Sequence, residues 1–299
     1  MLQKKKTMNE IKKVKFKTGL QVTFAHLLYS FNRHIKGVKA RNNLSYSLDR
    51  QKRHKLDISY PKTKKDGGYP CVIYLHGGGW TAYDKSLFRS TAKELASRGA
   101  VVFNCNYRLA PKFTFADMLV DVEEVFTYVR QNAKRYGGNP DRIIFAGDSS
   151  GGHLSALFVN RLFNDNSPLA KYIVGCVYFY GVFDLTTIGD VAFNNKTAYT
   201  NAAMPLDMPR REEYLREYSP ISYVCNTLPP TLFCSGRIDP LHKGQSEVYS
   251  AVLEKSGVRV ERLFFPVEDK EAEHRFITFS KCQPAQKSFE KFGEYLKTL

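Results

Sequence analysis

The stretch Arg142-Ile-Ile-Phe-Ala-Gly-Asp-Ser-Ser-Gly-Gly-His153 decides the fold of this chain. Its apolar first half predicts a buried strand, and the residues that follow the glycines predict a helix. Ser149 stands between glycines two positions away on each side, a spacing typical of a very tight strand-to-helix turn. Such a turn strains the backbone of the serine and needs glycines to avoid collisions across it. It holds the serine hydroxyl above the sheet, at the positive N-terminus of the helix.

On both sides of this turn, short apolar segments alternate with longer helical segments. The predicted strands are Lys55–Tyr60, Cys71–Leu75, Ala100–Asn104, Ile143–Ala146, Ile173–Tyr180, Thr231–Ser235 and Arg259–Phe265. The predicted helices are Ser86–Arg98, Phe115–Tyr136, His153–Phe163, Gln245–Ser256 and Pro284–Thr298. Several of the strands are continuous apolar runs, which are typical of a sheet buried on both faces. The alternation therefore predicts an α/β fold with a mostly parallel central sheet and helices on both faces.

The composition is that of a globular protein, and its basic charge is unevenly distributed. The chain has 299 residues, of which 43% are hydrophobic and 25% charged, with a formal net charge of +16. Residues 1–60 hold fifteen Lys and Arg against three acidic residues, a local excess of +12 that leaves the remainder near +4. Because the lysines of residues 1–17 are not interleaved with aromatic residues beyond Phe16, we expect no nucleic-acid partner.

The basic N-terminus leads into a segment with helical periodicity. Residues 1–17 carry seven lysines, and apolar residues then recur at Phe16, Leu20, Phe24, Leu27, Leu28, Phe31 and Ile35. This spacing predicts one amphipathic helix that packs on the main domain as part of a lid. A second interpretation is weak peripheral contact with an anionic membrane surface. We expect no membrane-spanning helix, because no apolar run approaches about 18 residues. We also expect no signal peptide, because Gln21, Thr23 and His26 interrupt the apolar part and there is no small-residue cleavage site.

The six cysteines do not form a recognisable disulfide or zinc pattern. Cys71, Cys105, Cys176 and Cys234 lie within or beside apolar runs, where a free cysteine behaves as a small buried side chain. There is no C-x-x-C pair, and no cluster of cysteine and histidine has zinc spacing. We therefore expect a reduced, cytoplasmic protein with neither a metal nor another cofactor.

A second glycine-rich segment follows another predicted strand. In Cys71-Val-Ile-Tyr-Leu-His-Gly-Gly-Gly-Trp80, three glycines come directly after the apolar run. Backbone N–H groups without side chains in the way can surround the oxyanion that forms when a serine attacks a carbonyl carbon. Together, the two glycine-rich segments indicate nucleophilic catalysis by Ser149.

A nucleophilic serine needs a base, and the base needs an acid to orient it. Five histidines lie in the basic extension or flank the glycine motifs: His26, His34, His54, His76 and His153. Of the remaining two, His274 follows the last strand and is favoured over His242. Asp239 follows the preceding strand at the same sheet edge, and Asp269 and Glu268 are alternative acids.

The motifs resemble those of the α/β-hydrolase esterases similar to hormone-sensitive lipase and the bacterial carboxylesterases, including acetyl esterases. The matching segments are His76-Gly77-Gly78-Gly79-Trp80, Asn106-Tyr107-Arg108-Leu109-Ala110-Pro111, Gly147-Asp148-Ser149-Ser150-Gly151-Gly152, Asp239-Pro240-Leu241 and His274-Arg275-Phe276. They cover roughly residues 70–280 in the order of the family. Two positions depart from the pattern: Lys112 replaces a usually acidic residue, and Arg275 stands where glycine is common.

The resemblance implies a role for each site residue. Ser149 would be the nucleophile, His274 the general base and Asp239 the residue that orients the base. The N–H groups of Gly78, Gly79 and Ser150 would form the oxyanion hole. The resemblance further implies a basic extension with a cap helix over residues 1–50, and a hydrolase domain over residues 51–299 with a cap insertion near residues 182–218.

The expected function is hydrolysis of small carboxylic esters, with short-chain acyl or acetyl esters as substrates and an acyl-enzyme intermediate. The same triad could instead serve an amidase, a formamidase or a small peptidase. A third interpretation is a non-catalytic binding protein, since plant gibberellin receptors resemble these esterases but lack the catalytic histidine. The presence of His274 favours an enzyme.

Overall fold

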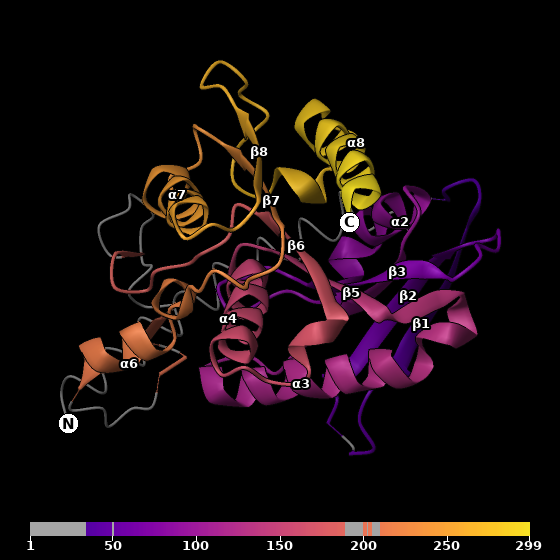
Figure 1. Ribbon diagram of the computed structural model, residues 1–299, viewed down its shortest axis with the longest axis horizontal. Coiled ribbons are helices and arrows are strands. Elements are labelled where there is room, and N and C mark those ends of the chain that lie inside the picture. Colours follow the sequence, from indigo (N-terminus) through magenta and orange to yellow (C-terminus); the bar gives the residue numbers. More distant parts are fainter. Residues whose placement is uncertain (1–33, 50, 189–199, 202, 205–209) are drawn as a thin grey trace.

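The computed structural model describes residues 34–49, 51–188, 200–201, 203–204 and 210–299 (Figure 1). Within these residues eight strands form one sheet in the order β1-β2-β4-β3-β5-β6-β7-β8. Neighbouring strands are antiparallel from β1 to β4 and parallel from β4 to β8. The strands are β1 (Val38–Ser45), β2 (Lys55–Pro61), β3 (Tyr69–Leu75), β4 (Val101–Cys105), β5 (Gly138–Asp148), β6 (Ile173–Phe179), β7 (Thr231–Gly236) and β8 (Val260–Phe265).

Helices cover both faces of this sheet (Figure 1). One face carries α2 (Arg89–Ser97) and α8 (Gln283–Thr298), and the other carries α3 (Phe115–Asn132), α4 (Ser150–Asn164) and α7 (Val248–Lys255). Successive residues of β3 alternate between the two cores: Ile73 packs with the α3 and α4 side, and Val72 and Tyr74 pack with the α2 and α8 side. This alternation explains the continuous apolar strands, because both faces are buried. The predicted α/β fold is confirmed.

The structure corrects the boundary of the predicted N-terminal extension. Strand β1 lies within residues 1–50, yet it pairs with β2, so the sheet begins before residue 51. The sequence analysis did not identify β1, because this edge strand exposes several polar residues and contains no apolar run. The predicted helix over residues 16–35 lies outside the described residues, except for its last two positions.

The predicted insertion is only partly described. Within residues 182–218 the structure places α6 (Arg211–Glu217), a two-turn helix that the sequence analysis did not identify. The segment that follows packs on α4, where the Asn160 side chain donates a hydrogen bond to the Pro220 carbonyl at 2.8 Å. No helix in the described part of the chain is long and apolar enough to cross a membrane.

A buried carboxylate ties the edge of the sheet to the helical layer. One oxygen of Asp57, on β2, accepts hydrogen bonds from the Asn43 backbone N–H and the Lys85 ammonium group, each at 2.8 Å. The other oxygen accepts from Arg89 Nε at 2.7 Å. The Lys85 side chain is only 3% exposed, so this carboxylate compensates a charge that water does not reach.

Replacing Asp57 with alanine is therefore expected to lower the free energy of unfolding by about 3–5 kcal/mol, because Lys85 is left buried without its counter-charge. Urea denaturation measures this loss. The control is Asp141→Ala, which removes the solvent-exposed partner of Arg130 and should cost less than about 1 kcal/mol. Equal losses for the two variants would contradict the importance assigned to burial.

Candidate active site

Three side chains from separate loops meet at the carboxyl ends of the parallel strands. Ser149 follows β5, Asp239 follows β7, and His274 lies beyond β8. The distance between His274 Nε2 and Ser149 Oγ is 3.0 Å, and that between His274 Nδ1 and Asp239 Oδ2 is 2.8 Å. A carboxylate only accepts hydrogen bonds, so Nδ1 carries the proton and Nε2 is left to accept from the serine hydroxyl.

The backbone at Ser149 has the strained geometry that the sequence indicates. Its φ is 49° and its ψ −119°, in a region that residues with a side chain rarely adopt. The glycines around it permit close contacts: a Cβ atom on Gly147 would lie 2.5 Å from the Gly151 backbone, and one on Gly151 would lie 2.0 Å from the Leu75 carbonyl oxygen. The turn therefore packs directly against the end of β3.

Asp239 is held in place through its second oxygen. Oδ1 accepts a hydrogen bond from the Leu241 N–H at 2.8 Å, and the side chain is fully buried. The alternative residues do not take these positions. Both ring nitrogens of His274 are engaged by Asp239 and Ser149, which leaves none for Asp269 or Glu268. His242 Nδ1 lies instead 3.1 Å from Ser235 Oγ.

The glycine triplet forms a tight loop beside Ser149. The Gly77 N–H donates to Asp148 Oδ1 at 2.8 Å, and the Tyr74 hydroxyl donates to the same oxygen at 2.9 Å. Burial raises the pKa of Asp148 to about 6, which is low enough for this carboxyl group to be mostly ionised at neutral pH. A Cβ on Gly77 would lie 2.4 Å from Asp148 Oδ2, so the loop and the serine turn can pack this closely only with glycine there.

Hydrogen bonds to the Gly78 carbonyl set the orientation of the peptide group between Gly78 and Gly79. The Gly78 carbonyl oxygen accepts hydrogen bonds from the N–H groups of Thr81, at 3.2 Å, and Ala82, at 3.1 Å. In a planar trans peptide the C=O and N–H bonds point in opposite directions. The N–H of Gly79 therefore points away from this turn. Gly78 has a φ of +136°, which glycine adopts without strain.

His153 lies beneath the glycine loop and is fully buried. It accepts a hydrogen bond from Trp80 Nε1 at Nδ1, at 3.2 Å, and donates from Nε2 to the Tyr218 carbonyl at 2.7 Å. Burial lowers the pKa of His153 to about 4, so the ring is neutral at pH 7. His153 therefore connects the glycine loop to the segment after α6 and acts as scaffolding.

Arg275 departs from the family pattern and connects two parts of the site. Its φ of 78° is in the left-handed region, which favours glycine. Its guanidinium Nη1 donates to the Tyr83 hydroxyl at 2.7 Å. Tyr83 follows the glycine loop, so this hydrogen bond joins that loop to the residue next to His274. No group of side chains suited to holding a metal ion occurs in the described residues.

Comparison with known proteins places the fold and the family. The BD-FAE family model matches residues 56–253. Esterase LipQ of Mycobacterium tuberculosis is 31% identical over 201 residues, which cover 63% of this chain and 46% of LipQ. Carboxylesterase NlhH of the same species is 28% identical over 245 residues, or 76% of this chain and 72% of NlhH. The chain spans about half the length of the first of these relatives.

Solved structures agree on the fold. Inhibited esterase B from Lactobacillus rhamnosis superimposes with a TM-score of 0.85 at 19% sequence identity, over 97% of this chain and 96% of that one. EstE1, a thermostable carboxylesterase cloned from a metagenomic library, superimposes with a TM-score of 0.73 at 21% identity, over 98% and 97% of the two chains. The predicted α/β-hydrolase fold is confirmed.

The buried histidine predicts a pH-dependent stability. An unfolded histidine titrates near pH 6.5, whereas folded His153 has a pKa of about 4. Between these values only the unfolded chain binds the proton. His153 therefore lowers the free energy of unfolding by about 1.4 kcal/mol for each unit by which the pH is decreased. Asp148, whose pKa is raised to about 6, has the opposite sign at mildly acidic pH.

The variant His153→Asn keeps a hydrogen-bonding side chain without this titration. Urea denaturation between about pH 4.5 and pH 6.5 should therefore show a less steep loss of stability in the variant than in the wild type. The comparison of slopes cancels any constant cost of the substitution. Parallel stability curves for the two proteins would contradict a neutral His153.

Proposed function

The chain belongs to the BD-FAE family, and from this membership and the geometry of the site we propose that it is a serine hydrolase of carboxylic esters. The observation that carries the proposal is the continuous set of hydrogen bonds from Ser149 through His274 to Asp239. A nucleophile, a base and a buried acid in this order perform acyl transfer on several unrelated folds. The names of curated relatives, esterase LipQ and carboxylesterase NlhH, support the same chemistry.

In the first half of the reaction, Ser149 Oγ attacks the carbonyl carbon of the ester. His274 Nε2 accepts the hydroxyl proton as the new C–O bond forms. Asp239, at Nδ1 of the same ring, keeps the base in the correct tautomer and stabilises its positive charge. The tetrahedral intermediate then collapses, and His274 gives its proton to the departing alcohol. An acyl group remains on Ser149.

In the second half, water takes the place of the alcohol. His274 removes a proton from the water molecule, the resulting tetrahedral intermediate collapses, and the carboxylic acid leaves as Ser149 regains its proton. In both halves the negative charge on the former carbonyl oxygen is received by the N–H groups of Gly78, Gly79 and Ser150. Such donors stabilise the transition state more than the substrate, and each contributes about 3–4 kcal/mol. Every proton transfer uses side chains of this chain, with no cofactor.

Short-chain acyl or acetyl esters are the proposed substrates. Trp80, the residue after the glycine triplet, is 2% exposed and packs edge-on against Phe115 and His153. Phe115 in turn stacks on Tyr214 and Tyr218. Aromatic rings therefore fill the volume beside the glycine loop, and this filled wall favours a small acyl group.

We also propose a cellular location for the protein and a contact with membrane surfaces. All six cysteines are unpaired, and four of them are buried, which is consistent with a reducing, cytoplasmic environment. The lysine-rich residues 1–17 would supply weak peripheral contact with anionic membrane surfaces. Residues 1–50 and 182–218 remain the proposed sources of a cap over the site, with β1 now assigned to the sheet.

Hydrolysis of p-nitrophenyl acetate, butyrate, octanoate and laurate tests the proposal directly. We expect the highest kcat/KM for acetate or butyrate, and a loss of at least about 10⁴-fold in Ser149→Ala, because the nucleophile is gone. Ser155→Ala is the matched control: this serine is buried in α4, the helix that begins after Ser149, and donates to the Ala146 carbonyl. Equal rates in wild type and Ser149→Ala would refute the assignment. Turnover of anilides alone would favour an amidase.

The acid of the triad is tested with a pair of aspartates. In Asp239→Asn the amide N–H faces Nδ1 and forces the proton onto Nε2, so the ring no longer accepts from Ser149. We expect kcat to fall about 10³- to 10⁴-fold with little change in KM. Asp269→Asn, at the alternative acid, should retain nearly full activity. A larger loss in Asp269→Asn than in Asp239→Asn would reverse the assignment.

A further inference from the structure

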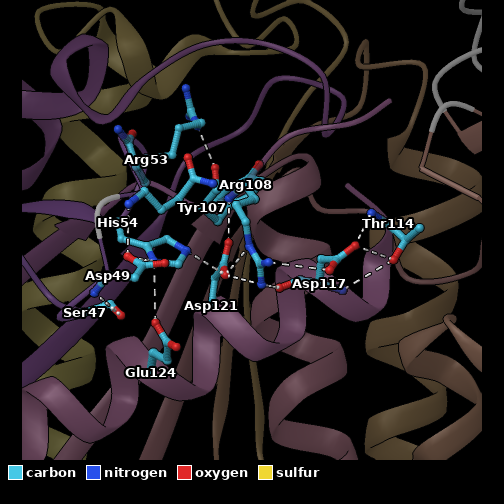
Figure 2. Close-up of polar contacts among 12 residues, drawn as sticks. Ser47, Asp49, Arg53, His54, Tyr107, Arg108, Thr114, Asp117, Asp121 and Glu124 are labelled. Carbon is cyan, nitrogen blue, oxygen red and sulfur yellow. Dashed lines mark hydrogen bonds and ion pairs between the residues drawn. The ribbon is translucent and has the colours of Figure 1, made fainter. Parts of the chain in front are cut away.

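A partly buried arginine outside all the sequence motifs contacts both ends of the glycine loop. Arg53 lies just before β2, and its guanidinium Nη2 is 3.1 Å from His76 Nε2 and 3.0 Å from the Tyr83 carbonyl oxygen. Its Nε donates to the Tyr107 carbonyl oxygen at 2.7 Å. Figure 2 shows Tyr107 beside Arg53. One side chain thus spans the loop from residue 76 to residue 83.

The contact with Arg53 determines the protonation of His76. A guanidinium group only donates hydrogen bonds, so Nε2 of His76 must carry a lone pair. Burial, together with the neighbouring positive charge of Arg53, lowers the pKa of His76 to about 3. The neutral ring therefore carries its single proton on Nδ1. That proton is donated to the Gly77 carbonyl oxygen, 2.7 Å away.

The hydrogen bond to Gly77 fixes the direction of a neighbouring N–H group. The carbonyl of Gly77 and the N–H of Gly78 belong to one planar peptide and point in opposite directions. Because His76 holds the Gly77 carbonyl oxygen by a hydrogen bond, the Gly78 N–H points away from His76. In the other tautomer, the lone pair on Nδ1 would face the carbonyl oxygen and repel it. The direction of this donor depends on which nitrogen of His76 is protonated.

We infer that Arg53 is a positioning residue for the oxyanion hole: it selects the tautomer of His76, and His76 orients the Gly78 N–H toward the oxyanion. The inference rests on the proposed function, since it assigns a role within the same reaction. The second contact, with the Tyr83 carbonyl, holds the far end of the loop.

The surroundings of Arg53 fix its position. The next residue, His54, is buried, with Nδ1 at 2.9 Å from Asp49 and Nε2 at 3.1 Å from Asp121 on α3. Asp121 also accepts from Arg108 Nε at 2.7 Å. Figure 2 shows this set of polar side chains joining the loop before β2 to α3. The backbone that carries Arg53 is therefore anchored independently of the glycine loop.

The variant Arg53→Met keeps a long side chain but removes all the donors. We expect kcat for p-nitrophenyl butyrate to fall about 10- to 100-fold with KM changed less than about 2-fold, because a misdirected donor weakens binding of the transition state and not of the substrate. A trifluoromethyl ketone, which forms an oxyanion on Ser149, should bind more weakly by a similar factor. A change in KM alone, or an unchanged ketone affinity, would overturn the inference.

Arg89→Met is the matched control. Arg89 is a partly buried arginine whose Nε donates to the buried Asp57 on β2 and not to the glycine loop. It should lose stability without losing kcat. If Arg53→Met does not fold, Arg53→Lys is measured instead. Lysine keeps the positive charge but cannot reproduce the several N–H donors of the guanidinium group. Its kcat should lie between that of the wild type and that expected of a variant lacking the donors. Wild-type kcat in Arg53→Lys would contradict the inference.

Nitrogen NMR of His76 provides a readout that does not depend on turnover. In the folded wild type at neutral pH, the ring should show a protonated Nδ1 and an unprotonated Nε2, and Arg53→Met should show a mixture of tautomers. A protonated Nε2 in the wild type would overturn the inference whatever the kinetics. A folded wild type inactive on esters would refute the proposed function and this role together, whereas an active wild type with a fully active Arg53→Met would refute this role alone.

Discussion

The close approach of the Ser149 turn to the end of β3 is the constraint on which the site depends. Only glycine fits at position 151, where a Cβ would lie 2.0 Å from the Leu75 carbonyl oxygen, and only glycine fits at position 77 against Asp148. The strained backbone of Ser149 persists because the strand before it and the helix after it are both buried in the core. The hydroxyl, the glycine loop and the base then share one sheet edge.

Around this edge, two buried histidines, His153 and His76, are hydrogen-bonded so that each has a defined protonation state. His153 accepts from Trp80 and donates to the Tyr218 carbonyl, and burial keeps it neutral. His76 is neutral for the same reason, and its tautomer follows from the donor beside it. Polar side chains buried in this way cost free energy unless they are hydrogen-bonded, and once bonded they allow few alternative arrangements. The result is a rigid frame for backbone N–H donors.

Much of the fold could be predicted because most helices and strands leave a pattern of apolar residues within a short stretch of sequence. Several of the strands from β2 to β8 contain apolar runs, and the predicted strands overlap the observed ones. Thr231–Ser235 was predicted for β7, which spans Thr231–Gly236, whereas β5 begins at Gly138, before the predicted start at Ile143. Strand β1 was missed because an edge strand exposes polar side chains and needs pairing, not an apolar run, to form. Helix α6 was missed because two turns within a polar insertion carry too little periodicity.

The sequence by itself determined the α/β fold class, the serine turn and the glycine triplet, and it indicated candidate residues for the base and the acid, because each follows from a short motif or from a position after a strand. Only the tertiary structure decided that His274 reaches both Ser149 and Asp239, that Arg275 bonds to Tyr83, and that Arg53 contacts His76. These contacts join residues far apart in the chain. Their distances depend on how strands and loops pack, which no local pattern encodes.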